Sequence, residues 1–121
     1  MTVLTEGMHT GEYLISEANG DRSREVVTLA SGNSVVAGEV LGVVTASGKY
    51  AAHDEGASDG TQNAVAIAYA AVDATSADAD CVITARDAEV NGAELTWPDG
   101  IAAGDKTDGI TSLATVGIIV R

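Results

Sequence analysis

The stretch VVTLASGNSVVAGEVLGVVTASGKY, residues 26–50, decides the fold class of this chain of 121 residues. Short runs of β-branched residues alternate in it with Gly, Ser and Asn, a pattern typical of strands joined by tight turns. The step Ala37-Gly38-Glu39 separates two apolar runs and predicts a sharp bend, because glycine adopts positive φ without steric cost. We therefore expect a mainly β chain with minor α content.

The rest of the chain predicts further short elements separated by acidic or glycine-rich loops. The run AVAIAYAAV is continuously apolar but too short for a long helix, which favours a buried strand. The expected elements are a loop over 53–61, a buried strand over 64–72, an acidic turn over 73–80, a strand over 81–85, a helical turn over 88–95, a loop over 99–108, a short helix over 110–114 and a C-terminal strand.

The composition predicts one domain with a core of small side chains. Hydrophobic residues make up 45% of the chain, but its aromatic residues are only three Tyr and one Trp, with no Phe. Val, Ile, Leu and Ala must then build the core, and a thin core makes self-association a favourable way to bury more apolar surface. In such a chain the single indole of Trp97, followed by Pro98, is expected to anchor either an interface or the core.

The charge distribution excludes several classes of partner. Eighteen acidic residues against six basic ones give a formal charge of -12, so nucleic acid is not an expected partner. No apolar run reaches the length of a membrane span, and the first residues lack the pattern of a signal peptide, so we expect no membrane partner. The lone Cys81 excludes an internal disulfide and is expected to be a small buried hydrophobe. The basic residues are scattered: Arg22, Arg24, Lys49, Arg86, Lys106 and Arg121.

No arrangement typical of an enzyme is present. The only histidines are His9 and His53, both expected to be exposed, and no serine elbow or phosphate-binding glycine motif accompanies them. The acidic loops lack the ligand spacing of a calcium site and are interpreted as a solvated surface. We expect no catalytic residue, no metal and no cofactor.

Lys49 supports an alternative function. It lies at the tip of a predicted hairpin after VVAGEVLG and resembles the swinging-arm lysine of lipoyl and biotinyl carrier domains. The surrounding Ser47-Gly48-Lys49-Tyr50 lacks the sequence context of those carriers, and a turn lysine kept in water is the simpler interpretation.

The first 25 residues differ from the rest and are interpreted as an extended N-terminal arm. They carry five acidic residues, two Arg and three Gly, with a short apolar stretch at Tyr13, Leu14 and Ile15. Such a segment buries little by itself, but it can add a strand to the sheet edge of a partner. We divide the chain into an arm, residues 1–25, and a β-rich body, residues 26–121.

Several stretches together resemble the head decoration proteins of tailed bacteriophages, the lambda type. The similarity rests on their order and spacing along nearly the whole chain, followed by a polar stretch and a terminal apolar strand. They are EYLISEANG at 12–20, Ser23-Arg24-Glu25, LASG at 29–32 through VLG at 40–42, RDAEV at 86–90, Leu95, Trp97 and Pro98.

The resemblance implies a compact bent-ribbon (β-clip-like) domain that forms homotrimers. Such trimers sit on the outer surface of the expanded capsid at three-fold and quasi-three-fold positions and stabilise it against internal DNA pressure. The protein would be non-enzymatic, with the major capsid protein and itself as partners, and would reside in the host cytoplasm before assembly.

The resemblance also suggests which residues carry these contacts. The arm would meet the capsid protein and the body would trimerise, with Trp97 and Pro98 at the trimer interface or as a core anchor. The expected capsid-binding residues are Glu12, Tyr13, Leu14, Ile15, Arg22 and Arg24.

Overall fold

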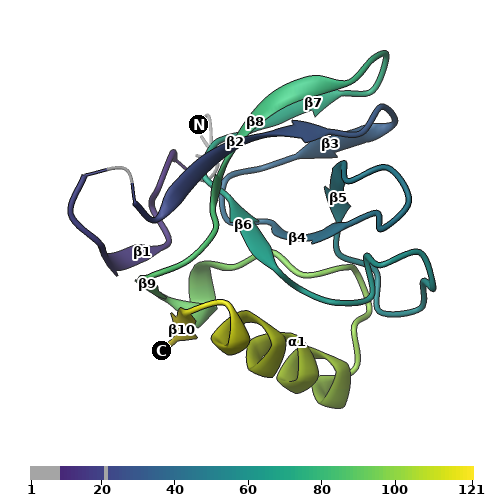
Figure 1. Cartoon of the computed structure of the whole chain (residues 1–121). Helices are drawn as coiled ribbons and strands as arrows, with labels where there is room; N and C mark the ends of the chain where they lie inside the picture. Colours follow the sequence, from purple (N-terminus) through teal and green to yellow (C-terminus); the bar gives the residue numbers. More distant parts are fainter. Residues whose placement is uncertain (1–8, 21) are drawn as a thin grey trace, which may run out of the picture.

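The computed structural model describes residues 9–20 and 22–121 (Figure 1). The described chain is mainly β, with one α-helix and one short 3-10 helix, as the sequence predicts. The strands are β1 (Leu14–Glu17), β2 (Arg24–Leu29), β3 (Asn33–Val35), β4 (Val40–Val43), β5 (Tyr50–Ala52), β6 (Ala66–Ala68), β7 (Val72–Ala74), β8 (Ala79–Thr84), β9 (Ala88–Val90) and β10 (Ile118–Val120); the 3-10 helix is η1 (Gly92–Glu94) and the α-helix is α1 (Ala103–Thr115).

Five strands close into a small barrel in the order β2-β5-β4-β6-β8. The longest pairing is antiparallel, between β2 and β8, and β4 and β5 form a hairpin. A parallel contact between Leu29 and Tyr50 completes the ring. The expected bend is present, because Gly38 has a φ of 90° and Glu39 N donates a hydrogen bond to Val36 O (3.1 Å). The predicted ribbon is thus folded round into a closed barrel, while β3 and β7 pair as a separate two-stranded ribbon (Figure 1).

Small side chains fill the barrel. Ala66 and Ala68 of β6 point into it, while Ile67 between them packs into a second cluster outside. Burial on both faces explains why this segment is continuously apolar, since alternate residues of a strand serve opposite faces. The barrel core contains Leu29, Val35, Leu41, Ala66, Ala68, Ala74, Cys81 and Ile83.

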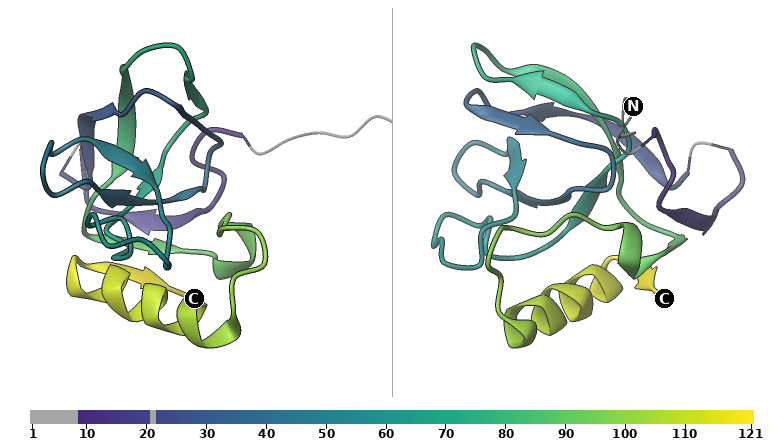
Figure 2. Two further views of the ribbon diagram at one scale, coloured as in Figure 1. Left: turned by 90° about the vertical axis from the view of Figure 1, so that its right-hand side faces the viewer. Right: turned by 180° about the vertical axis from the view of Figure 1, so that it is seen from behind.

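A second core lies between the barrel, the helix α1 and a sheet of order β1-β9-β10. Helix α1 runs below the barrel strands in both views of Figure 2. Leu113 is the fully buried apolar residue of the helix, and Ile118 of β10 follows it into the same cluster. The core members are Tyr13, Val40, Ala64, Ile67, Val90, Leu113 and Ile118.

The helix is longer than the sequence predicts. We expected a loop over 99–108 and a helix only over 110–114, whereas α1 spans Ala103–Thr115. Gly104, Gly109 and two Asp lower the helix propensity of α1, but packing against the second core compensates for that preference. No helix among the described residues combines the length and the hydrophobicity that a bilayer crossing requires.

Three other predicted elements need correction. Residues 88–95 are not a helical turn throughout, because Ala88–Val90 forms β9 and only Gly92–Glu94 is helical. Strand β9 is paired on both sides, with β1 and with β10, and these long-range partners override the local preference. The apolar run 64–72 contributes only β6 before the chain turns. The acidic stretch 73–80 ends β7 and begins β8.

Candidate functional site

A pocket of about 250 Å³ lies beside the start of β4 and the end of β5. The segment that leads from η1 to α1 forms one side of the pocket. Two backbone hydrogen bonds hold this segment in place: Thr96 N donates to Gly38 O (2.9 Å), and Val40 N donates to Thr96 O (3.0 Å). Its wall is formed by Glu39, Val40, Ala52, His53, Thr96, Trp97, Pro98 and Asp99.

His53 forms one wall of this pocket and is buried, with only 3% of its surface exposed. The prediction of an exposed loop histidine is therefore wrong. The loop folds back on itself, since Asp54 N donates to Thr61 O (3.0 Å), and no local sequence signal reports that closure. The Nδ1 atom of His53 lies 2.9 Å from the same Thr61 carbonyl. A carbonyl only accepts, so Nδ1 carries the proton, and Nε2 has no partner among the described residues.

Trp97 also lines the pocket and is half-buried. The far edge of its indole packs on α1, where a Cβ added to Gly109 would lie 2.5 Å from Cζ3. The ring meets His53 edge to face, with centroids 5.9 Å apart and planes at 80°. The indole Nε1 is buried, and it too lacks a partner in the described part of the chain. Trp97 thus packs against the second core.

A carboxylate lines the pocket next to these rings. Glu39 is partly buried, and burial raises the pKa of its carboxyl, against the opposing effect of the hydrogen bond that Val36 N donates to Oε1 (3.2 Å). Val36 itself lies on the same turn with 45% of its surface exposed. With Asp99 also on the wall, the pocket disfavours an anionic occupant.

The N-terminal segment is attached to the body from Gly11 onward. Tyr13, an expected capsid contact, is fully buried, and its hydroxyl lies 2.5 Å from Thr84 Oγ1. Desolvation raises the pKa of the Tyr13 phenol, although the Thr84 hydrogen bond lowers it. Gly11 has a φ of 67°, and a Cβ there would lie 2.8 Å from the Tyr69 ring. Tyr13 is therefore a core residue, and its side chain is not available to a partner.

The arm was expected to add a strand to a partner's sheet, and its strand β1 instead pairs within the molecule. It pairs antiparallel with β9, because the chain itself supplies that partner at high effective concentration. The register shifts between Leu14 and Ser16, and Ile15 in this irregularity has 55% of its surface exposed. Leu14 is half-buried against the second core, while Glu12 is exposed. Of the expected apolar contacts, only Ile15 faces solvent.

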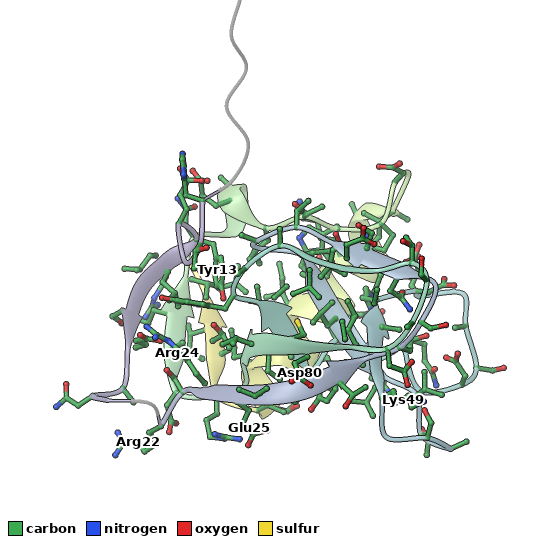
Figure 3. All side chains as sticks on the ribbon, turned by 90° about the horizontal axis from the view of Figure 1, so that it is seen from above. Tyr13, Arg22, Arg24, Glu25, Lys49 and Asp80 are labelled. Atoms are coloured by element: carbon green, nitrogen blue, oxygen red, sulfur yellow. The ribbon has the colours of Figure 1, made fainter. Side chains whose placement is uncertain are left out.

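The two expected arginines differ in their surroundings (Figure 3). The guanidinium of Arg24 forms an ion pair with Glu17, donating from Nε (3.2 Å), and lies 4.2 Å over the Tyr69 ring. Burial by itself would raise the pKa of the Glu17 carboxyl, but the hydrogen bonds from Arg24 and Ser23 outweigh burial and hold this pKa below its ordinary value. Arg22 stands at the outer edge, with its side chain 71% exposed and Nε 3.5 Å from Asp87.

Comparison with known protein families identifies the chain. Residues 3–118 match the family described as Bacteriophage lambda head decoration protein D. The chain belongs to this family. The match covers nearly the whole sequence and confirms the resemblance seen in the residues. A search of curated proteins finds no match.

Membership in the head decoration protein D family settles the functional class. The protein is a non-enzymatic structural component of the virion that resides on the phage capsid surface, where it decorates and stabilises the head. Among residues 9–20 and 22–121, no three His, Cys, Asp or Glu side chains come together as a possible metal site.

Lys49 of this decoration protein lies at the end of the predicted β4–β5 hairpin turn. Val44 N donates to Lys49 O (2.9 Å), and the Lys49 ammonium is 2.6 Å from Asp78 Oδ2. The hydrogen bond from Lys49, together with that from Ser31 N, lowers the pKa of Asp78. The lysine is thus tied to a neighbouring loop, and nothing in its surroundings favours the carrier alternative.

Proposed function

We propose that this head decoration protein is a homotrimeric clamp at the three-fold and quasi-three-fold positions of the expanded head. On the outer surface it holds the capsid subunits together against the pressure of packaged DNA. The observation that carries the proposal is the family match over residues 3–118.

The charge and the core of the subunit support an external, oligomeric role. A formal charge of -12 repels DNA and fits a position on the outside of the shell. The two cores consist almost entirely of aliphatic side chains, and association would bury more apolar surface for each copy. A three-fold ring closes all its interfaces and leaves no free end.

We assign capsid contact to the arm, residues 1–25, and trimer formation to the body, residues 26–121. The packing of Tyr13 and the ion pair of Arg24 position this segment, whereas Glu12, Ile15 and Arg22 present exposed side chains to the shell. Three arms in one trimer act together, and linkage of this kind raises binding by about 10²–10⁴ over a single arm.

A matched pair of variants tests the arm. Ile15→Ser removes an exposed apolar side chain from β1, and Val26→Ser removes a similar one, 68% exposed, from β2 in the body. Binding to expanded phage heads is measured by co-sedimentation at increasing protein concentration. We expect Ile15→Ser to weaken binding about tenfold per arm, since about 1.4 kcal/mol corresponds to a factor of ten.

The Val26→Ser variant should bind the heads as the unchanged protein does. Equal binding by all three proteins would remove β1 from the capsid contact. Sedimentation of the free variants checks that neither substitution alters the oligomeric state.

A further inference from the structure

We propose that Asn19 is a site of spontaneous deamidation in the free decoration protein, and that the fold protects Asn91 from the same reaction. The sequence contains the Asn-Gly pair twice, as Asn19-Gly20 and as Asn91-Gly92. The co-reactant is water, and the products are aspartate and isoaspartate at position 19. The inference does not depend on the proposed function, because it concerns the chain before it meets a capsid.

The reaction needs only the two residues of the pair and water. The backbone nitrogen of the glycine attacks Cγ of the asparagine, a five-membered succinimide closes, and the side-chain nitrogen leaves as ammonia with the proton of the backbone N–H. Water then opens the ring. Cleavage of the N–Cγ bond gives aspartate, and cleavage of the bond to the backbone carbonyl gives isoaspartate. Glycine favours the attack because it has no Cβ to hinder the close approach of its nitrogen.

The structure leaves both reacting groups of the first pair accessible. Asn19 and Gly20 are exposed and follow β1, where the chain stands clear of the barrel (Figures 1 and 2). Gly20 has a φ of 68°, and a Cβ built there would meet nothing within 4 Å. Within residues 9–20 and 22–121, no acceptor binds the Gly20 N–H, and no partner binds the Asn19 side chain. The nitrogen and the carbonyl carbon can therefore turn toward each other.

The second pair is held on both sides of the reacting bond. Gly92 N donates to Arg121 O (3.0 Å), and the side chain of Asn91 accepts from Ala93 N through Oδ1 (3.0 Å). A Cβ at Gly92 would lie 2.9 Å from Cγ1 of Val120, so β10 packs closely on this glycine. Attack on Cγ requires Gly92 N to lose its proton and to turn away from Arg121 O. The C-terminal strand thus protects Asn91.

Deamidation changes both the charge and the backbone of the first 25 residues. A neutral amide becomes a carboxylate, which adds one negative charge to a chain whose formal charge is -12. Isoaspartate also inserts one extra methylene into the main chain just after β1. Both changes fall in the segment to which we assign capsid contact, so that segment differs between a fresh and an aged preparation.

Peptide mass spectrometry of the full-length protein during incubation tests the proposal. Replacement of an amide NH₂ by OH raises the mass of the peptide that carries it, so the two asparagines are followed in the same sample. Labelling by isoaspartyl methyltransferase identifies the isoaspartate product. A parallel incubation in denaturant exposes both pairs and gives their intrinsic rates. Asn91 is thus the matched control for Asn19 within one molecule.

We expect Asn19 to react at least about tenfold faster than Asn91 in the folded protein, because the hydrogen bond and the packing of Gly92 must open first. In denaturant the two rates should converge. The variant Asn19→Gln must close a larger ring and should remove the more acidic form that ion-exchange chromatography separates, while the rate at Asn91 stays the same.

Three results would overturn the inference. Asn19 that stays intact in the folded protein, over a period in which the denatured chain reacts, would show that the turn after β1 does not permit the attack. Equal rates at both asparagines in the folded protein would remove the protection by β10. A rate ratio that persists in denaturant would assign the difference to the neighbouring residues and not to the fold. Each result leaves head decoration untouched, since co-sedimentation of Asn19→Gln with expanded heads measures that property separately.

Discussion

The contact between Trp97 and Gly109 makes a sharp prediction about two glycines of one helix. A Cβ at Gly109 would lie 2.5 Å from Cζ3 and 2.8 Å from Cη2 of the indole, whereas a Cβ at Gly104 would meet nothing within 4 Å. The rigid ring cannot move its far edge without displacing its neighbours. Gly109→Ala and Gly104→Ala therefore both add one methyl group to the helix, but only the methyl group at position 109 clashes with the indole.

The expected magnitudes follow from two opposing terms. Replacing Gly by Ala inside a helix stabilises it by about 1 kcal/mol. Overpacking a filled site costs about 1–3 kcal/mol. Gly104→Ala should therefore raise the free energy of unfolding by up to about 1 kcal/mol, and Gly109→Ala should leave it unchanged or lower it by up to about 2 kcal/mol.

Thermal unfolding followed by circular dichroism, at one protein concentration, measures the difference. We expect the Tm of Gly104→Ala to exceed that of Gly109→Ala by about 4–12 °C for a chain of this size. The fluorescence of the single tryptophan should change in Gly109→Ala and not in Gly104→Ala. A Gly109→Ala variant as stable as Gly104→Ala, with unchanged fluorescence, would refute the packing of Trp97 on α1.

Three further predictions concern the core and the pH dependence of stability. Tyr13→Phe leaves the buried Thr84 hydroxyl without this partner and should lower the free energy of unfolding, measured by chemical denaturation, by about 1–3 kcal/mol. The double variant Tyr13→Phe with Thr84→Val should lose less of this free energy than the two single variants lose together. The pKa of Glu17 is lowered beside Arg24, so the stability that its charged form contributes is present above the ordinary carboxyl pKa and is lost as the pH falls through the lowered value. The Tm of Glu17→Gln should therefore fall less steeply between about pH 5 and about pH 3 than the Tm of the unchanged protein. The same decrease of Tm with pH in both proteins would contradict the ion pair. Burial raises the pKa of the Cys81 thiol to about 11, so a thiol reagent at about pH 8 should react with it only after denaturation, and rapid labelling of the native protein would contradict its burial.

The sequence predicts the strands of this protein better than their partners. The turn at Gly38 and the hairpin before Lys49 depend on local φ preferences and on β-branched runs, and both are present. Cys81 is buried, as expected for a lone cysteine that acts as a small hydrophobic residue. Such features are encoded within a few residues of each other.

Features that depend on long-range contacts could not be predicted in this way. Tyr13 and Thr84 are 71 residues apart, and only the pairing of β1 with β9 brings the aromatic ring into the core. The burial of His53 likewise depends on Trp97 from a distant segment. Helix α1 has a weak local preference for helix, and it forms because Leu113 and the Trp97 ring stabilise one of its faces.

Cryo-electron microscopy of expanded phage heads incubated with this protein tests the central claim most directly. The account predicts three-lobed density on the outer surface at the three-fold and quasi-three-fold positions, with β1 facing the shell. Bare heads, single copies at other positions, or density inside the shell would contradict it.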